Sequence, residues 1–329
     1  MTYFLIIAGF ALLLFGGEAV VRGSVALAQR LGVSPLIVGL TIVGFGTSLP
    51  EMVVSVNAAL VGSPGIAVGN VVGSNIANIL LILGVAAIIA PIAVRPDAVR
   101  RDMTGMAAVT LIYVVLGMTG QIVLWQGILM LVALAAYIGF TVWYDNKTND
   151  AVAEPHREEA EEMGVIPLRT ISIAGIIVTG LFAVVVGAEW LVTGATSLAT
   201  AFGVPEEVIG LTIVAFGTSL PELATSIVAA YRGHAEVCVG NVLGSNIFNL
   251  FGITGVTALF APLPFSASII GFDLWVLVAA TVLLVPFMMT GLKIHRLTGA
   301  ILIALYIAYI AVQFIGMNGA VSLLSVTVA

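Results

Sequence analysis

The chain has 329 residues, of which 60% are apolar and 9% are charged, and its net charge is -6 at pH 7. Soluble domains have about a quarter of their residues charged, so this composition excludes an ordinary soluble protein. Most of the net charge comes from the segment 145–169 and therefore indicates neither a nucleic-acid partner nor an acidic one. A single cysteine, Cys238, excludes an intramolecular disulfide and a metal site made of several thiolates.

Long apolar runs recur from the first residues of the chain to the last. Each is long enough to form a helix that crosses a hydrocarbon core roughly 30 Å thick. No basic region precedes the first run, which favours a retained first span over a cleaved signal peptide. The sequence therefore predicts an all-α polytopic membrane protein with ten transmembrane helices. The predicted spans are 2–29, 34–61, 65–90, 100–119, 121–144, 170–199, 206–231, 235–262, 271–291 and 296–318.

Positive charges predict the orientation of these spans, because cytoplasmic loops of membrane proteins are enriched in Lys and Arg. If the N-terminus lies outside, all 11 Lys and Arg residues fall in inside loops. We therefore expect both termini outside and the segment 145–169 in the cytoplasm as an acidic linker. A regulatory cation-binding loop is the alternative for this segment, which lacks the acidic and glycine spacing of an EF-hand.

An eight-residue stretch occurs twice, each time inside a long apolar run. Residues 44–51 read GFGTSLPE, and residues 215–222 read AFGTSLPE, at an offset of 171 positions. The same offset aligns further residues of the two halves: Gly69–Asn78 with Gly240–Asn249, Glu18 with Glu189, and Asp102 with Asp273. This predicts two five-helix repeats, 1–144 and 170–329, on either side of the linker. Because five is odd, the second repeat is inverted, an arrangement typical of secondary transporters with broken helices at the repeat interface.

Proline and glycine predict that the helix is broken inside each repeated stretch. Pro50 has no N–H, and its ring clashes with the carbonyl of Gly46 four residues back. Gly44 and Gly46 lower the resistance to bending. We therefore expect the helix to open around residues 44–48 and release carbonyls in mid-membrane, where only buried or cavity-lining backbone is tolerated. Pro221 predicts the same break in the second half.

Released carbonyls, hydroxyls and one carboxylate from each copy form an all-oxygen set, which suits hard cations such as Na⁺ and Ca²⁺. Glu51 follows Thr47 and Ser48 by four and three positions, so the three share one helix face. If the two copies meet, Glu51 and Glu222 require a divalent ion, monovalent ions or protons to neutralise them. A loaded site is then near neutral and an empty one is charged. This predicts coupled ion exchange by alternating access rather than a channel.

The second repeated segment adds neutral oxygen donors. Ser74 and Asn78 are four positions apart on a helix, as are Ser245 and Asn249, so each pair lies on one face. For these four residues we favour a place in the ligand shell. For the other amides of the segment we favour hydrogen bonds that join helices; these are Asn70, Asn75, Asn241 and Asn246.

The paired GTSLPE and GN-x-x-GSN-x-x-N segments resemble the two α-repeats of the Ca²⁺/cation antiporter superfamily, and most of all its prokaryotic sodium/calcium exchanger branch. The resemblance covers essentially the whole chain and implies a location in a prokaryotic inner (cell) membrane. It also implies that the first and sixth spans slide against the other eight. The carbonyls of Gly44 and Ala215 are implied as ion ligands. The implied side-chain ligands are Thr47, Ser48, Glu51, Ser74, Asn78, Thr218, Ser219, Glu222, Ser245 and Asn249.

One residue departs from the pattern of that branch, which often has Asp where this chain has Asn249. The departure leaves the ion stoichiometry and the coupling ion open. We predict an antiporter that exports Ca²⁺ in exchange for Na⁺; the alternative is a Ca²⁺ or other cation/H⁺ exchanger that uses Glu51 and Glu222. We expect the ions to bind as transported substrates, with no cofactor, no nucleic acid and no obligate protein partner. An enzyme is disfavoured, because no HExxH helix or intramembrane nucleophile with a His is present.

Glu18 and Glu189 lie in matching glycine-rich segments of the two halves. Arg22 follows Glu18 by one helical turn, so an ion pair accounts for this acid. Glu189 is followed at that position by Thr193. A gating role for either acid is the alternative.

Overall fold

The computed structural model describes residues 1–94, 96–148, 170–202 and 217–327. Most of the predicted linker 145–169, the first part of the predicted span 206–231 and the carbonyl of Ala215 lie outside these residues. The first half consists of α1 (Thr2–Leu31), α2 (Pro35–Val38), the π-helix η1 (Gly39–Val43), α3 (Gly44–Thr47), α4 (Leu49–Leu60), α5 (Pro64–Ala77), the π-helix η2 (Asn78–Ile82), α6 (Leu83–Ile89), α7 (Pro96–Gly117), the strand β1 (Gln121–Ile122) and α8 (Leu124–Thr148).

The second half repeats much of this order. Its elements are α10 (Thr170–Ala201), α13 (Leu220–Tyr231), α14 (Ala235–Ile247), the π-helix η5 (Phe248–Ile253), α15 (Thr254–Ala258), the strand β2 (Leu263–Pro264), the π-helix η6 (Ile269–Asp273), α16 (Leu274–Thr290) and α17 (Arg296–Thr327). The prediction of a helical membrane protein is confirmed.

The number of spans differs from the prediction of ten. In the described part of the chain, 7 helices are long and apolar enough to cross a membrane, or up to 8 if the bent pair Pro35–Thr47 and Leu49–Leu60 is one span. Two predicted spans do not enter this count. α7 has 22 residues but carries Arg100, Arg101 and Asp102 near its start. The span 206–231 is described only from residue 217 onward.

The helices that carry the second motif lie at the centre of the bundle. The apolar window in Ala235–Ala258 is 100% buried, and that in Pro64–Ile89 is 72% buried. The window in α17 is only 11% buried, as expected for a helix that faces lipid. Because Ser, Asn and Gly of the second motif lie on the most buried helices, their polar atoms must find partners inside the protein.

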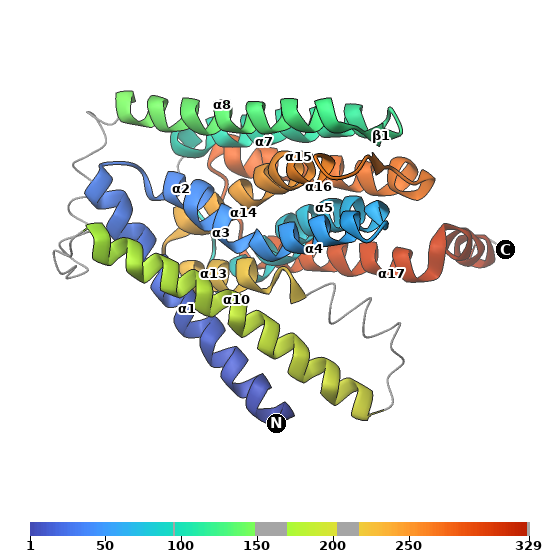
Figure 1. The fold of residues 1–329 in the computed structure, drawn as a ribbon, viewed down its shortest axis with the longest axis horizontal. Helices are drawn as coiled ribbons and strands as arrows, with labels where there is room; N and C mark the ends of the chain where they lie inside the picture. Colours follow the sequence, from blue (N-terminus) through green and yellow to red (C-terminus); the bar gives the residue numbers. More distant parts are fainter. Residues whose placement is uncertain (95, 149–169, 203–216, 328–329) are drawn as a thin grey trace.

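α1 and α10 run side by side and cross the other long helices at an oblique angle (Figure 1). They are antiparallel and in close contact through glycines. A Cβ atom at Gly9 would lie 2.7 Å from the carbonyl oxygen of Gly187, and one at Gly16 would lie 2.9 Å from that of Gly180. Gly180 and Gly187 are the repeat equivalents of Gly9 and Gly16 at the offset of 171 positions. Each of the two close contacts is therefore the repeat equivalent of the other.

Two short β contacts join the halves at opposite ends of the bundle. Ile92 and Ile294 form an antiparallel bridge. Gln121 and Ile122 of β1 pair with Pro264 and Leu263 of β2. The 22 residues of α7 separate Ile92 from β1 along the chain, a length of about 33 Å at 1.5 Å per residue. The repeats are therefore connected to each other at both ends.

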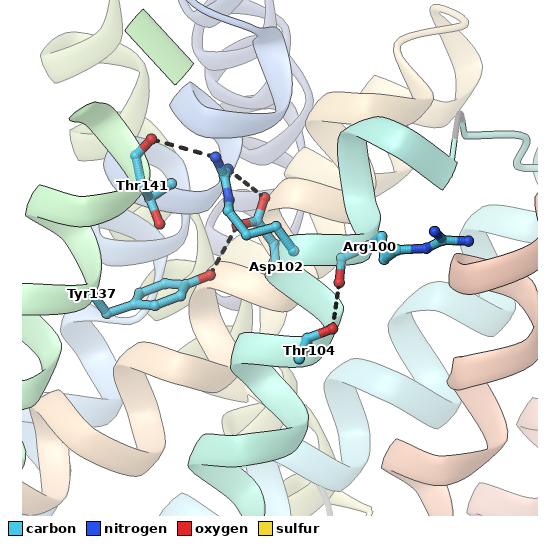
Figure 2. Close-up of polar contacts among 6 residues, drawn as sticks. Arg100, Asp102, Thr104, Tyr137 and Thr141 are labelled. Carbon is cyan, nitrogen blue, oxygen red and sulfur yellow. Dashed lines mark hydrogen bonds and ion pairs between the residues drawn. The ribbon is translucent and has the colours of Figure 1, made fainter. Parts of the chain in front are cut away.

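Asp102, fully buried on α7, holds that helix against α8. Figure 2 shows its carboxylate facing Tyr137, whose hydroxyl donates to Asp102 Oδ1 at 3.0 Å. Arg101 donates to both carboxylate oxygens, at 2.8 and 3.0 Å, and to the Thr141 carbonyl at 3.4 Å. A buried carboxylate is tolerated when it is paired and hydrogen-bonded in this way. These contacts explain Asp102 as a connection between helices.

Asp273, at the matching position of the second half, makes a related contact. It accepts from the hydroxyl of Tyr309 on α17 at 3.0 Å and from the side-chain amide of Gln313. The residue before it is Phe272, so the arginine beside the first aspartate has no equivalent. In both halves, therefore, the aspartate connects its own helix to the next long helix of the chain.

Candidate cation-binding site

The two repeated stretches break the helix at the same residue. Ser48 has φ −84° and ψ 7°, and Ser219 has φ −87° and ψ 4°. New helices begin directly afterwards, at Leu49 and Leu220, each with proline in its first turn. Proline is tolerated there, because N–H groups in the first turn have no partner within the helix.

The break is narrower than predicted. The sequence indicates opening over residues 44–48, but Gly44–Thr47 forms the short helix α3 and only Ser48 leaves the helical conformation. The carbonyl of Gly44 accepts from the Ser48 N–H at 3.3 Å and from Ser245 Oγ at 3.2 Å. Both acceptor positions of this carbonyl are therefore used within the protein. The carbonyl of Gly46 loses its usual donor, because residue 50 is proline.

The break places one glutamate in the first turn of each new helix. Glu51 lies in the first turn of α4, and Glu222 in the first turn of α13. The positive end of the helix dipole stabilises a carboxylate at this position. Both glutamates are buried, with 1% of their surface exposed. The pairing of the two carboxylates around one ion stays a prediction.

Each glutamate accepts a hydrogen bond from the serine of the other half. Ser48 Oγ donates to Glu222 Oε1 at 2.9 Å, and Ser219 Oγ donates to Glu51 Oε1 at 3.3 Å. The offset of 171 positions exchanges the two bonds, so they are equivalent under the repeat. This reciprocal arrangement uses one oxygen of each carboxylate and connects the two broken helices directly.

The second motifs of the two halves contact each other through their amides and hydroxyls. Asn249 Nδ2 donates to Ser74 Oγ at 3.2 Å, so the two motifs of opposite halves touch. Asn78 donates through its own Nδ2 to another side chain of the second half. Thus both ligand-candidate amides bond to protein through nitrogen and keep the oxygen for another partner.

Four buried oxygen atoms of these residues have no hydrogen-bond partner within the described part of the chain. They are Glu51 Oε2, Glu222 Oε2, Asn78 Oδ1 and Asn249 Oδ1. Leaving one buried acceptor unpaired costs about 1–3 kcal/mol, and more when the group is charged. The four form two pairs related by the repeat. Buried acceptors without donors are the chemical complement of a bound cation.

Thr47 and Ser245 lie beside this group. The Thr47 hydroxyl lies 3.0 Å from the Val43 carbonyl oxygen, 3.2 Å from Asn241 Oδ1 and 3.5 Å from Ser245 Oγ. Thr218, the repeat equivalent of Thr47, is half-buried. Hydrogen bonds thus connect Ser48 with Glu222, Ser219 with Glu51, and Thr47 with Ser245 at the helix breaks, and Ser74 with Asn249 on the second-motif helices. Of the predicted ligands, only Ala215 falls outside the described residues.

Two of the remaining amides join helices, as predicted. Asn70 Nδ2 donates to the carbonyl of Glu51 at 3.1 Å, and Asn241 Nδ2 donates to that of Glu222 at 3.3 Å. Each bond holds the backbone of a central glutamate against the second-motif helix of its own half. This repeated contact fixes the position of the carboxylate without using the amide as a ligand.

Sequence reasoning missed the π-helices at the site. η2 begins at Asn78, and η5 begins at Phe248, one residue before Asn249. π-helical turns often occur at functional sites, where they alter side-chain direction and backbone bonding. The one signal in the sequence is that the motif residues have the same spacing in both halves, and this does not distinguish a π-helix from an α-helix.

Glu18 forms the predicted ion pair with Arg22. It also binds Arg232, which follows α13, with Nη2–Oε1 at 2.6 Å and Nε–Oε2 at 2.9 Å. The pair therefore connects α1 to the end of a helix that carries a central glutamate. Glu189, in the matching position of the second half, is exposed.

Comparison with known proteins agrees with this geometry. The family model described as sodium/calcium exchanger protein matches residues 1–143 and 172–315. The chain is 32% identical over 346 residues to the sodium/calcium exchanger MaX1 of Methanosarcina acetivorans, a match that covers 95% of this chain and 99% of that protein. It is 36% identical over 262 residues to the inner membrane protein YrbG of Escherichia coli K12, covering 78% and 79%.

A solved structure has the same fold. The sodium-calcium exchanger NCX_Mj, soaked with zero Na⁺ and Ca²⁺, superimposes with a TM-score of 0.81 at 34% sequence identity. The match covers 95% of this chain and 98% of that one. Helical architecture, the paired motifs and these similarities together show that the chain belongs to the sodium/calcium exchanger family of integral membrane antiporters.

Proposed function

We propose that this protein is a secondary active antiporter that exports Ca²⁺ in exchange for Na⁺, with Glu51 and Glu222 as its central paired carboxylates. The observation that carries this proposal is the set of four buried, unpartnered oxygens on Glu51, Glu222, Asn78 and Asn249. Two are carboxylate and two are amide oxygens, as Ca²⁺ and Na⁺ require. Among the described residues, no group of three or more His, Cys, Asp or Glu could hold a resident metal ion.

Charge balance supplies the coupling mechanism. Two ionised carboxylates in a site closed to water repel each other, and one Ca²⁺ or two Na⁺ neutralise them. An empty site is costly to carry through the closed state between the two sides, because a buried charge without a partner is destabilising. The loaded site crosses readily and the empty site does not, so Ca²⁺ movement in one direction is tied to Na⁺ movement in the other.

Alternating access requires two equivalent ways of opening, and the repeat is suited to this requirement. We propose ten spans in two inverted repeats, 1–144 and 170–329, joined by the cytoplasmic linker 145–169. Symmetric serine–glutamate contacts, symmetric helix breaks and β contacts at both ends of the bundle support this arrangement. Both termini then lie outside a prokaryotic cell membrane. The transported ions are substrates, and no cofactor takes part.

A cation/H⁺ exchanger is the second candidate, and one observation favours it. Asn78 and Asn249 are both neutral, so the site holds only two carboxylates, and two protons neutralise these as well as two Na⁺ do. The two candidates differ in the gradient that drives transport, which one experiment separates.

The experiment measures Ca²⁺ uptake into proteoliposomes that contain the full chain. In one arm, a Na⁺ gradient is imposed at constant pH; in the other, a pH gradient is imposed without Na⁺. We expect the Na⁺ gradient to drive uptake and the pH gradient to have little effect. Uptake driven only by the pH gradient would establish the second candidate and overturn the first. Uptake without any countergradient, carried as an uncoupled current, would contradict both.

Asn249→Asp tests the charge balance directly. A carboxylate at the unpartnered Oδ1 position adds one negative charge to a buried site, so a neutral loaded state needs one more monovalent cation. We expect more Na⁺ or H⁺ transported per Ca²⁺ and a steeper dependence of transport on pH. The ion ratio is measured from the membrane potential at which net Ca²⁺ flux is zero.

Asn57→Asp is the matched control for this substitution. Asn57 lies on the same helix as Glu51 but is exposed, so the added charge lies outside the buried site. This variant should keep the wild-type ion ratio and pH profile. If Asn249→Asp also kept both, position 249 would not contribute to the charge of the site.

A further inference from the structure

One buried amide outside the predicted ligand set contacts the site directly. Asn246 lies on α14 with 1% of its surface exposed. Its Oδ1 accepts a hydrogen bond from Asn78 Nδ2 at 3.0 Å, across the two halves of the chain. From the sequence, this residue is expected only to join helices. The hydrogen bond joins the two helices, and its direction also sets the orientation of the Asn78 amide.

The direction of the bond follows from a third residue. A side-chain amide has one end that donates and one end that accepts, and its partners decide which end points where. Asn246 Nδ2 donates to the sulfur of Met106 on α7 at 3.7 Å. A thioether sulfur has no hydrogen to donate, so Asn246 must turn its nitrogen toward Met106. Its oxygen then necessarily faces Asn78.

The orientation of Asn246 in turn fixes that of Asn78. Because Asn246 presents an oxygen, Asn78 must donate through its nitrogen, and its own oxygen must point the other way. That atom, Asn78 Oδ1, is one of the four buried oxygens without a partner in the described part of the chain. A cation binds the oxygen of an amide and is repelled by the hydrogens of its nitrogen. The orientation of Asn78 therefore decides whether it is a ligand.

We propose that Asn246 is a positioning residue of the cation site: with Met106, it holds the Asn78 amide so that its oxygen faces the ion. The proposal rests on the function proposed above, since it requires Asn78 to be a ligand. It adds an amide and a methionine on two other helices, neither of which touches the ion itself.

The repeat-related position beside Asn249 lacks this arrangement and supplies a matched control. Asn75, the repeat equivalent of Asn246, is fully buried, but its nitrogen donates to the Val71 carbonyl of its own helix at 2.7 Å. The equivalent of Met106 is Leu277, which has no acceptor. Asn249 donates instead to Ser74 Oγ, whose own hydrogen is donated to the Val71 carbonyl. Asn75→Ala thus removes the same buried group without touching Asn78 or Asn249.

The test measures the Kd for Ca²⁺ of the purified full-length protein by equilibrium binding of radioactive Ca²⁺. Asn246→Ala should raise the Kd about tenfold, the value of one well-made hydrogen bond. Met106→Leu should raise it about threefold, because sulfur is a weak acceptor. Asn75→Ala should leave it nearly unchanged. Thermal unfolding without Ca²⁺ checks that each variant is folded. A wild-type Kd in Asn246→Ala, or an equal loss in Asn75→Ala, would overturn the proposal.

A second set of variants separates positioning from general support of the fold. In Asn78→Asp, both carboxylate oxygens are acceptors, so no end of the group needs to be selected. Adding Asn246→Ala to this variant should cause no loss of Ca²⁺ affinity. A tenfold loss in both backgrounds would show a structural role only and overturn the proposal.

The function proposed above fails in a distinguishable way. If Asn78→Ala leaves the Kd unchanged, Asn78 is not a ligand, and the proposed site is wrong at this position. If Asn78→Ala raises the Kd and Asn246→Ala does not, the site stands and only the positioning role is overturned.

Discussion

Glu51→Gln and Glu222→Gln, each made alone, should reduce Na⁺-driven Ca²⁺ uptake by about 100-fold or more. Each replaces a buried carboxylate by an amide of the same shape, and losing one partner of a buried charge pair costs about 2–5 kcal/mol. Each glutamate also keeps a hydrogen bond from the serine of the other half, which Gln can accept equally well. The loss should therefore fall on ion binding and not on the fold.

Stability provides an independent readout for the same variants. Without ions, the wild-type site holds two buried carboxylates, each with one oxygen that has no partner, and either substitution removes one of these charges. We expect the ion-free variants to unfold at a temperature equal to or above that of the wild type, and Ca²⁺ to stabilise them much less. Uptake is measured in proteoliposomes and unfolding in detergent.

Glu189→Gln is the control for these substitutions. Glu189 is exposed on α10 and lies outside the buried group at the helix breaks. Transport should remain close to that of the wild type. Wild-type uptake in Glu51→Gln or Glu222→Gln would contradict the assignment of the central carboxylates.

Gly244→Ala should destabilise the protein by about 3 kcal/mol and abolish high-affinity Ca²⁺ binding. A Cβ atom at this position of α14 would lie 2.0 Å from the carbonyl oxygen of Leu40 and 2.6 Å from its Cα. These are backbone atoms of η1 and cannot rotate away, so the two helices must separate. Separation breaks the contacts that Ser245 and Thr47 make across this interface.

Gly139→Ala is the matched control for the helix–helix contact. Gly139 lies within α8, and no described atom lies within 4 Å of a Cβ added there. Alanine is favoured over glycine in a helix by about 1 kcal/mol, so this variant should be unchanged or slightly more stable. Thermal unfolding and Ca²⁺ binding are measured for both. A wild-type melting temperature and Kd in Gly244→Ala would show that the close packing of η1 on α14 does not hold the site.

The duplicated motif predicted much of the site because its chemistry acts locally. Pro50 and Pro221 prevent a continuous helix whatever surrounds them, so a break near each was predictable. The position of the break was less certain. It falls at Ser48 alone, because Gly44–Thr47 keeps its helical bonds while packed on α14. The number of spans that the described residues support is also lower than the prediction.

Partners across the halves were not predictable from spacing within one half. Ser48 could have bonded Glu51 on its own helix, but in the fold it donates to Glu222. Glu18 pairs with Arg22 as the i,i+4 spacing predicts, yet it also binds Arg232 from a distant helix. Such contacts depend on how the repeats pack, which no short segment specifies.

The sequence by itself determined the membrane environment, the duplication, the broken helices and the residue types of an oxygen-lined cation site. Each of these depends on composition, on the spacing between repeated segments or on the geometry of a few neighbouring residues. Only the tertiary structure decided which oxygens remain without a partner, where the π-helices lie, and that Met106 and Asn246 orient Asn78. The physical reason is that a hydrogen bond has a direction, and the direction of a buried bond is set by atoms far away in the chain.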